Sequence, residues 1–273
     1  MNYKFTFEKI SPQHEFAGVG FAGNIFIILN ALSVIGDDDL LFVDMETNDC
    51  VCTEKDLILY DTKNCWEYYF NQVKLGKDFS NLDFRTPSIL NYESKTDFLV
   101  PENFIRLKHR FYKSFKPKQY LIDFIDDFYC KNLKNKVTLA VQIRLTDMLN
   151  HHNVSPLNRY LEKINEILKE NEKIEQIFLA TDDNSVIKTL KNEIKIPIIF
   201  HENMSRADVN KPNLNPYDRY KSSREQHKYK LGMECLIEIL TMSKCDFLLK
   251  ADKSALSITS VILSDNLQKI YAT

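Results

Sequence analysis

Charged and hydroxyl side chains follow three separate apolar runs of the sequence, at the points where those runs end. They are Arg144, Thr146 and Asp147 after residue 143, Thr181, Asp182 and Asp183 after residue 180, and Asp252 and Ser254 after residue 250. An arginine guanidinium matches the oxygens of a diphosphate, and a serine at the start of a helix donates to the same anion. A carboxylate accepts hydrogen bonds from the N–H edge of a base such as guanine. If these residues meet, they form a site for a nucleotide diphosphate.

Each of these residues also has a purely structural interpretation. Arg144 and Asp147 would form a solvated ion pair at a strand end, which contributes little. Asp183 stands directly before Asn184 and Ser185, and for this residue we favour the role of a helix N-cap.

The elements that would position these residues alternate between strand and helix. We expect strands over 137–143, 177–180, 196–200 and 245–250, and helices over 157–168, 186–194, 233–242 and 254–264. Such alternation is typical of a parallel sheet covered by helices, a Rossmann-like domain. In an open parallel sheet, ligands bind outside the carboxyl ends of the strands, which is where the polar residues lie.

The first half of the chain is less regular. We expect a buried helix over 25–35, a strand over 40–45, loops with polar turns over 66–99 and a helical stretch over 103–134. The change of pattern puts a domain boundary near residue 135, with domains over 1–135 and 136–273.

The composition excludes several classes of function. Lys plus Arg number 36 and Asp plus Glu 38, so the net charge of −2 gives no general attraction to nucleic acid. The six cysteines include no Cys-x-x-Cys pair, and Cys50 and Cys52, alternating along a strand, would point to opposite faces. We therefore expect reduced, mostly buried thiols. The N-terminal residues form no apolar leader and no segment has the apolar length of a membrane span, which favours a cytoplasmic protein.

Several segments resemble, in the same order, the motifs of the fucosyltransferase superfamily that includes the α1,2-, α1,6- and protein O-fucosyltransferases. Residues 20–26 (GFAGNIF) are similar to its N-terminal Gly-x-Gly-Asn-x-x-Phe signature, and residues 141–147 (VQIRLTD) to its His-x-Arg-x-x-Asp motif. Residues 66–70 (WEYYF), 178–183 (FLATDD) and 232–263 resemble further blocks of the family.

The resemblance implies a GT-B-like α/β fold, in which two Rossmann-like domains face a central cleft, residues 1–135 on the acceptor side and 136–273 binding the nucleotide sugar. It implies an inverting, metal-independent glycosyltransferase that uses a GDP-sugar, usually GDP-fucose, and no cofactor. By position, Arg144 would hold the β-phosphate, Asp182 or Asp183 the guanine, and Ser254 with its helix start the phosphates. Thr181 is a further candidate for binding the nucleotide sugar. Two departures stand in the central motif: Gln142 replaces its histidine and Leu145 replaces a frequent second arginine. Glutamine can still hydrogen-bond a purine.

The transfer needs a cation at the leaving diphosphate and a base for the acceptor hydroxyl. Arg144 is the expected cation. Asp147, His151 and His152 are the candidate bases, and in the α1,6-type relatives a glutamate stands where this chain has His152. The basic and aromatic segment 201–230 adds Arg219 and Arg224 as second-rank phosphate contacts, although a solvated surface loop explains that segment equally well.

Two other functions remain open. Gly18, Gly20 and Gly23 match the Gly-x-Gly-x-x-Gly of an NAD(P)-dependent oxidoreductase, with Asp44 about twenty residues on. Such a fingerprint follows a strand, and residues 11–16 are polar and contain a proline, so that context is missing. In the glycosyltransferase interpretation the same glycines allow a tight backbone turn, with Asn24 facing the sugar or the acceptor. Alternatively, the glycines form a tight turn for packing and bind no ligand. The third function is a family member that binds the nucleotide sugar but has lost catalysis, as Gln142 and Leu145 would allow.

The acceptor is expected only by resemblance. It would be an oligosaccharide or a lipid-linked glycan precursor in polysaccharide biosynthesis, handled by an enzyme without a transmembrane segment that associates at most peripherally with a membrane.

Overall fold

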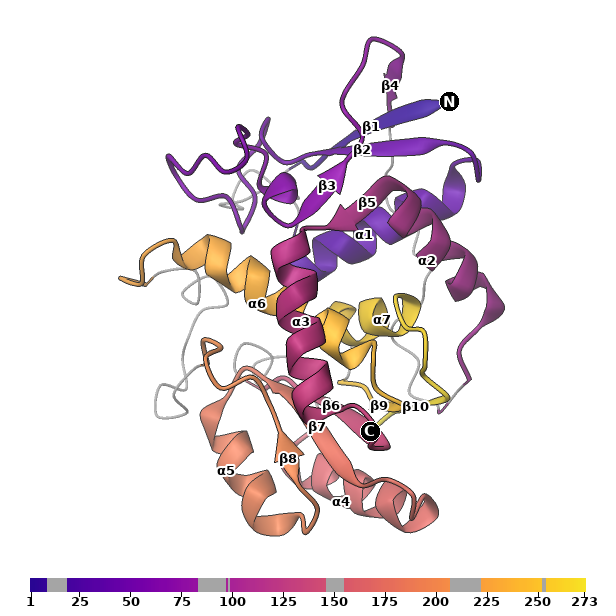
Figure 1. The fold of residues 1–273 in the computed structure, drawn as a ribbon, viewed down its shortest axis with the longest axis vertical. Coiled ribbons are helices and arrows are strands. Elements are labelled where there is room, and N and C mark those ends of the chain that lie inside the picture. Colours follow the sequence, from indigo (N-terminus) through magenta and orange to yellow (C-terminus); the bar gives the residue numbers. More distant parts are fainter. Residues whose placement is uncertain (9–18, 83–96, 98, 146–154, 207–221, 252–253) are drawn as a thin grey trace. The chain divides into compact units, whose positions relative to one another are not determined.

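The structure, a computed structural model, describes the whole chain except residues 9–18, 83–96, 98, 146–154, 207–221 and 252–253 (Figure 1). Contacts divide the chain into two compact units. Unit 1 comprises Met1–Asn91, Glu102–Phe124 and Ser222–Leu236, and unit 2 comprises Tyr92–Pro101, Ile125–Lys221 and Ile237–Thr273. The division falls at Phe124, inside a helix, and both units are discontinuous in sequence. The split into an acceptor-side domain over 1–135 and a nucleotide-sugar-binding domain over 136–273 stays a prediction.

Unit 1 begins with a parallel β-α-β arrangement. Strand β1 (Asn2–Thr6) pairs with β2 (Leu40–Asp44) along its whole length, and β4 (Phe79–Asn81) pairs with the other edge of β1 (Figure 1). Helix α1 (Phe21–Val34) connects β1 to β2. Its residues Ile25, Ile28, Leu29 and Leu32 are at most 1% exposed. Because α1 is apolar on most sides, the sequence shows a buried helix there without an amphipathic stripe.

An aromatic cluster forms the rest of the core of unit 1. It is built from the short helix η1 (Cys65–Tyr68), the antiparallel pair β3 (Phe70–Gln72) and β5 (Phe115–Pro117), helix α2 (Glu102–Ser114) and the start of α3 (Gln119–Asn132). Trp66 stacks on Phe70 with ring centres 4.5 Å apart and meets Phe115 edge-on at 5.1 Å. The expectation of loops alone over 66–99 is wrong for β3 and β4, since strands of three residues are too short to show a hydrophobic period.

Unit 2 is a five-stranded parallel sheet in the order β10-β9-β6-β7-β8 (Figure 1). Its strands are β6 (Thr138–Ile143), β7 (Gln176–Thr181), β8 (Ile198–Ile199), β9 (Phe247–Leu249) and β10 (Lys269–Tyr271). The helices between them are α4 (Leu157–Glu170), α5 (Asn184–Glu193), the end of α6 (His227–Met242) and α7 (Ala255–Ile262). Every residue of β6, β7 and β9 is buried, which explains why these strands read as continuous apolar runs.

Most of the expected elements are confirmed, with the α/β class itself. Strands β1 and β10 were not expected, although Tyr3, Phe5 and Phe7 alternate with polar residues as a half-buried strand does. All six cysteines are thiols outside any disulfide; Cys130 is exposed and Cys235 half-buried, and the other four are buried. In the part of the chain that is described, the helices fall short of the length and apolarity that crossing a bilayer requires.

Candidate functional site

The order of the sheet in unit 2 brings the predicted residues to neighbouring strand ends. Strand β6 lies between β7 and β9, with Ile143 opposite Thr181 and Val141 opposite Leu249. Arg144 follows β6, and Asp182 follows β7; both are half-buried. The Leu145 amide donates to Asp182 Oδ1 at 3.2 Å, which ties the two strand ends together. The expected convergence of these strand ends is therefore present in the sheet.

Ser254 stands at the start of α7, the helix that follows β9. Its side chain is 3% exposed, and its hydroxyl has no hydrogen-bond partner among the described residues. It occupies the N-cap position without making the usual side-chain cap. A buried hydroxyl without a partner costs about 1–3 kcal/mol, so the structure leaves a donor for a ligand or a water molecule beside the amides of the helix start.

Gln142 holds α7 against β6. The Ala251 amide donates to Ser257 Oγ at 3.2 Å, and that hydroxyl in turn donates to Gln142 Oε1. Gln142 is buried. Its carbonyl oxygen already accepts one hydrogen bond, from Ser257, while its NH₂ group is the side chain's donor.

Asp183 and Thr181 serve the local structure at the start of α5. Asp183 Oδ1 accepts hydrogen bonds from the Ser185 amide at 2.7 Å and from its hydroxyl at 2.8 Å, which confirms the N-cap interpretation. Thr181 Oγ1 accepts from the Asp183 amide at 3.3 Å. The carboxylate of Asp183 is thus committed to the cap, and a base contact by Asp182 stays a prediction.

The glycine-rich start of α1 lies in unit 1. Gly20 is exposed, while Asn24 is fully buried and accepts a hydrogen bond from the Val19 amide at 2.8 Å. Asn24 Nδ2 has no partner within the described residues. A Cβ on Gly23 would collide with the Val19 side chain. Close packing against Val19 therefore explains the glycine at position 23. The side-chain NH₂ group of Asn24 remains a possible donor to a ligand.

An oxidoreductase fingerprint requires a strand before its glycines, and the sequence did not predict one. Strand β1 does precede the glycines in the chain, and it runs parallel to β2. Asp44 nevertheless has its carboxylate filled by the protein itself. It pairs with Lys4 Nζ at 2.6 Å and accepts from Thr47 Oγ1 and from the amides of Glu46 and Thr47. Burial raises the pKa of Asp44, but these hydrogen bonds outweigh it and lower the pKa to about 2. To bind a ribose, the Asp44 carboxylate would have to give up hydrogen bonds that it already makes within the protein.

The remaining predicted residues divide between unit 1 and undescribed segments. In unit 1, Arg224 Nη1 pairs with Glu234 Oε1 at 2.8 Å, and its Nε and Nη2 are buried with no partner among described residues. Thr146, Asp147, His151, His152, Arg219 and Asp252 lie outside the described residues.

No family model matches the chain, and no curated protein matches it in sequence. Solved structures do match. A NodZ α-1,6-fucosyltransferase co-crystallised with GDP covers 97% of this chain and 93% of its own, with a TM-score of 0.58 at 12% identity. The same enzyme soaked with GDP-fucose gives 0.57 at 13% identity over 97% and 93% of the two chains. NodZ from Bradyrhizobium gives 0.56 at 12% identity over 95% and 92%.

This chain has a fucosyltransferase-like fold. The expected GT-B-like α/β class is thereby confirmed. At 12–13% identity the similarity establishes the fold, and a fold does not by itself determine an activity.

Two cations at the strand ends of this fucosyltransferase-like fold were not singled out from the sequence. Lys250 directly follows β9 and is 2% exposed, which is rare for a lysine. Arg206 lies at the end of β7, where Nε donates to the Thr181 carbonyl at 3.2 Å and Nη2 to the His201 carbonyl at 2.7 Å. The only sequence signal for Lys250 was its place immediately after an apolar run, and Arg206 was one basic residue of the segment 201–230.

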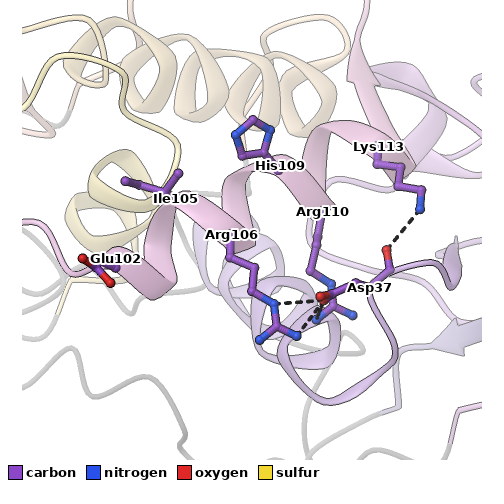
Figure 2. Close-up of a pocket in the computed structure, with 7 residues that line it drawn as sticks. All are labelled: Asp37, Glu102, Ile105, Arg106, His109, Arg110 and Lys113. Carbon is purple, nitrogen blue, oxygen red and sulfur yellow. Dashed lines mark hydrogen bonds and ion pairs between the residues drawn. The ribbon is translucent and has the colours of Figure 1, made fainter.

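A separate pocket of about 620 Å³ lies in unit 1 along α2, and none of the predicted site residues lines it (Figure 2). Figure 2 shows Arg106 and Lys113 pointing toward Asp37; Arg106 Nη2 lies 2.6 Å from Asp37 Oδ1 and Lys113 Nζ 3.1 Å from the Asp37 carbonyl oxygen. Arg110 is buried and donates to the Ile35 and Gly36 carbonyls. These cations hold the loop that follows α1 against α2, which gives each of the three a structural role.

Proposed function

We propose that this chain is an inverting, metal-independent glycosyltransferase that moves a sugar, expected to be fucose, from a GDP-sugar to a glycan hydroxyl. The observation that carries the proposal is the buried hydroxyl of Ser254 at the start of α7, which has no hydrogen-bond partner among the described residues. Helix α7 follows β9, and β9 pairs with β6, the strand that Arg144 follows. A hydroxyl donor, helix amides and a guanidinium at adjacent strand ends suit a diphosphate. The solved structures with a similar fold include one with GDP and one soaked with GDP-fucose.

The reaction breaks the bond between the anomeric carbon and the β-phosphate oxygen while the acceptor oxygen attacks from the opposite face. Negative charge grows on the departing diphosphate, and Arg144 is the group proposed to neutralise it, in the role a metal ion takes in other transferases. A single well-placed donor of this kind contributes on the order of 10²–10³ in rate. Asp182 is proposed to bind the guanine edge, with the NH₂ group of Gln142 as a second contact.

The proton of the acceptor hydroxyl needs a base late in the reaction. Asp147 and His152, shortly after Arg144 in the sequence, remain the proposed bases. The proposed acceptor is an oligosaccharide or lipid-linked glycan in cytoplasmic polysaccharide biosynthesis, and this rests on the family resemblance alone.

Titration calorimetry with GDP, GDP-fucose, UDP and NAD tests the proposal. Wild type should bind GDP and GDP-fucose. Arg144→Ala should weaken GDP binding about 10- to 100-fold, because a charge-assisted hydrogen bond is worth about 1.5–3 kcal/mol. Ser254→Ala should weaken it by roughly 2- to 10-fold. Arg159→Ala, which removes an exposed arginine from α4 of the same unit, is the matched control and should bind as wild type does.

The outcomes separate the rival functions. Equal GDP affinity in wild type and Arg144→Ala would remove Arg144 from the site. Binding of NAD without binding of GDP would favour the oxidoreductase. Tight binding of GDP-fucose, with neither slow hydrolysis of the donor nor transfer to any glycan offered, would identify a binding protein that has lost catalysis.

A further inference from the structure

Three buried cysteines of unit 1 meet at one point. Cys50, Cys52 and Cys65 are each at most 1% exposed. Cys52 Sγ and Cys65 Sγ lie 2.9 Å apart, and Met45 Sδ lies 3.6 Å from Cys65 Sγ. Cys50 and Cys52 were expected to point to opposite faces of a strand. They lie instead in a turn closed by a hydrogen bond from the Thr53 amide to the Cys50 carbonyl, which is why they can share one neighbour.

The Cys52 and Cys65 sulfur atoms are in direct thiol–thiol contact at 2.9 Å, without a bond between them. A disulfide requires about 2.05 Å between sulfur atoms, so the two atoms need to approach by less than about 1 Å. Within the part of the chain that is described, no group of three or more histidine, cysteine or acidic side chains is arranged to hold a metal ion. We propose that Cys52 and Cys65 form a reversible disulfide when the protein meets a peroxide.

The chemistry balances with hydrogen peroxide as the oxidant. The sulfur of Cys65 attacks one peroxide oxygen, the O–O bond breaks, and one water leaves as Cys65 becomes a sulfenic acid. Cys52 then attacks the Cys65 sulfur and expels the hydroxyl as a second water. Two thiols are oxidised and one peroxide is reduced to two waters; a dithiol reductant reverses the bond by exchange.

The hydrogen bonds within the cluster select Cys65 as the first nucleophile. Burial raises the pKa of the Cys65 thiol, but this sulfur accepts hydrogen bonds from Cys50, Cys52 and Thr53, and together they lower its pKa. Burial and the hydrogen bond to Cys65 raise the pKa of Cys52. Thr53 is half-buried and its hydroxyl lies 3.5 Å from Cys65 Sγ, so the cluster is one side chain away from the surface for an oxidant the size of peroxide.

The bond would close a segment that supports α6. Between the two cysteines, Glu54 Oε2 accepts hydrogen bonds from the Lys228 amide at 2.9 Å and the Tyr229 amide at 3.4 Å, at the start of that helix. Gly232 of α6 packs so closely that an added Cβ would lie 3.2 Å from Cys52 Cβ. Oxidation is therefore expected to slow amide exchange over residues 53–64 and at the first turn of α6.

The experiment treats the folded Cys130→Ser protein with hydrogen peroxide, because this background lacks the exposed thiol. Peptide mapping after alkylation should find the Cys52–Cys65 link, and dithiothreitol should remove it. Cys52→Ser and Cys65→Ser in the same background should lose the link, while Cys50→Ser should keep it. The oxidised protein should melt roughly 5–10 °C higher, as closing a loop of this length predicts.

Mapping of the otherwise unsubstituted cluster decides the question even if a serine variant fails to fold. A Cys52–Cys65 link formed in the folded protein supports the proposal. Its absence, when half-buried Cys235 has already been oxidised, overturns the proposal. The proposal also fails if the link forms only at the rate of global unfolding measured in urea.

Discussion

Replacing Asp44 by asparagine separates a structural carboxylate from one that binds a ribose. In the folded protein its side chain is 7% exposed and its pKa is lowered to about 2, against an ordinary value of 3.8. At about 1.36 kcal/mol per pH unit, this difference contributes about 2.4 kcal/mol of stability at neutral pH. Because the folded-state pKa is the lower one, the contribution is complete above about pH 4 and disappears as the pH falls through 2. About half of it remains at pH 3.

Urea unfolding followed by tryptophan fluorescence measures the free energy of unfolding of unit 1, to which Asp44 belongs. The chain has a single tryptophan, Trp66, which is buried in the core of unit 1, the unit that contains Asp44. Asp44→Asn should lose about 2 kcal/mol at pH 7 and clearly less at pH 3, because asparagine keeps an acceptor for the backbone amides but not the ion pair with Lys4. Asp38→Asn, at a fully exposed aspartate, is the control and should change stability by less than about 0.5 kcal/mol. Equal unfolding of wild type and Asp44→Asn at pH 7 would refute the reasoning, and loss of nucleotide binding at unchanged stability would revive the oxidoreductase.

Two further predictions concern the stability contributed by one buried residue in each unit, Gly232 in unit 1 and His201 in unit 2. Gly232→Ala should destabilise unit 1 by about 1–3 kcal/mol, because its Cβ would push the Tyr69 ring out of its stack on Tyr229, where the ring centres are 5.7 Å apart; unchanged Trp66 unfolding in urea would contradict this. In unit 2, burial and then the nearby charge of Arg206 lower the pKa of His201 to about 4, so the unfolded chain binds a proton that the folded chain refuses. Between pH 7.5 and 5 the stability should fall by about 2 kcal/mol, and His201→Gln should remove that dependence in circular-dichroism melts; the same slope in the variant would assign it to other groups.

The strands and helices of unit 2 could be predicted because their sequence signals are strong. Strand β6 is six buried residues long, and α4 carries Tyr160, Ile164 and Ile167 on one face. The order of the sheet then brings Arg144 and Asp182 to neighbouring ends, as the strand-end rule requires.

The roles of individual polar residues were less predictable, since they depend on contacts distant in sequence. The side chain of Gln142 could hydrogen-bond a nucleotide base, yet its oxygen accepts a hydrogen bond from Ser257, a residue 115 positions away. Asp44 has the spacing of a ribose ligand, yet Lys4 on the unexpected strand β1 pairs with it. The Ser254 hydroxyl, which lacks a hydrogen-bond partner among the described residues, could not be predicted, because the sequence does not show which polar groups go unpaired.

The return of residues 222–236 to unit 1 has a consequence for how the protein is made. Tyr229, on the late segment, stacks on Tyr69 and hydrogen-bonds Tyr120, both of which the ribosome delivers long before it. During synthesis the N-terminal part of unit 1 therefore exposes the aromatic surface that Tyr229 later covers, and exposed apolar surface of this kind promotes aggregation. A truncated chain ending at residue 135 would be held permanently in this state, so we expect it to aggregate unless a peptide spanning 222–236 is supplied.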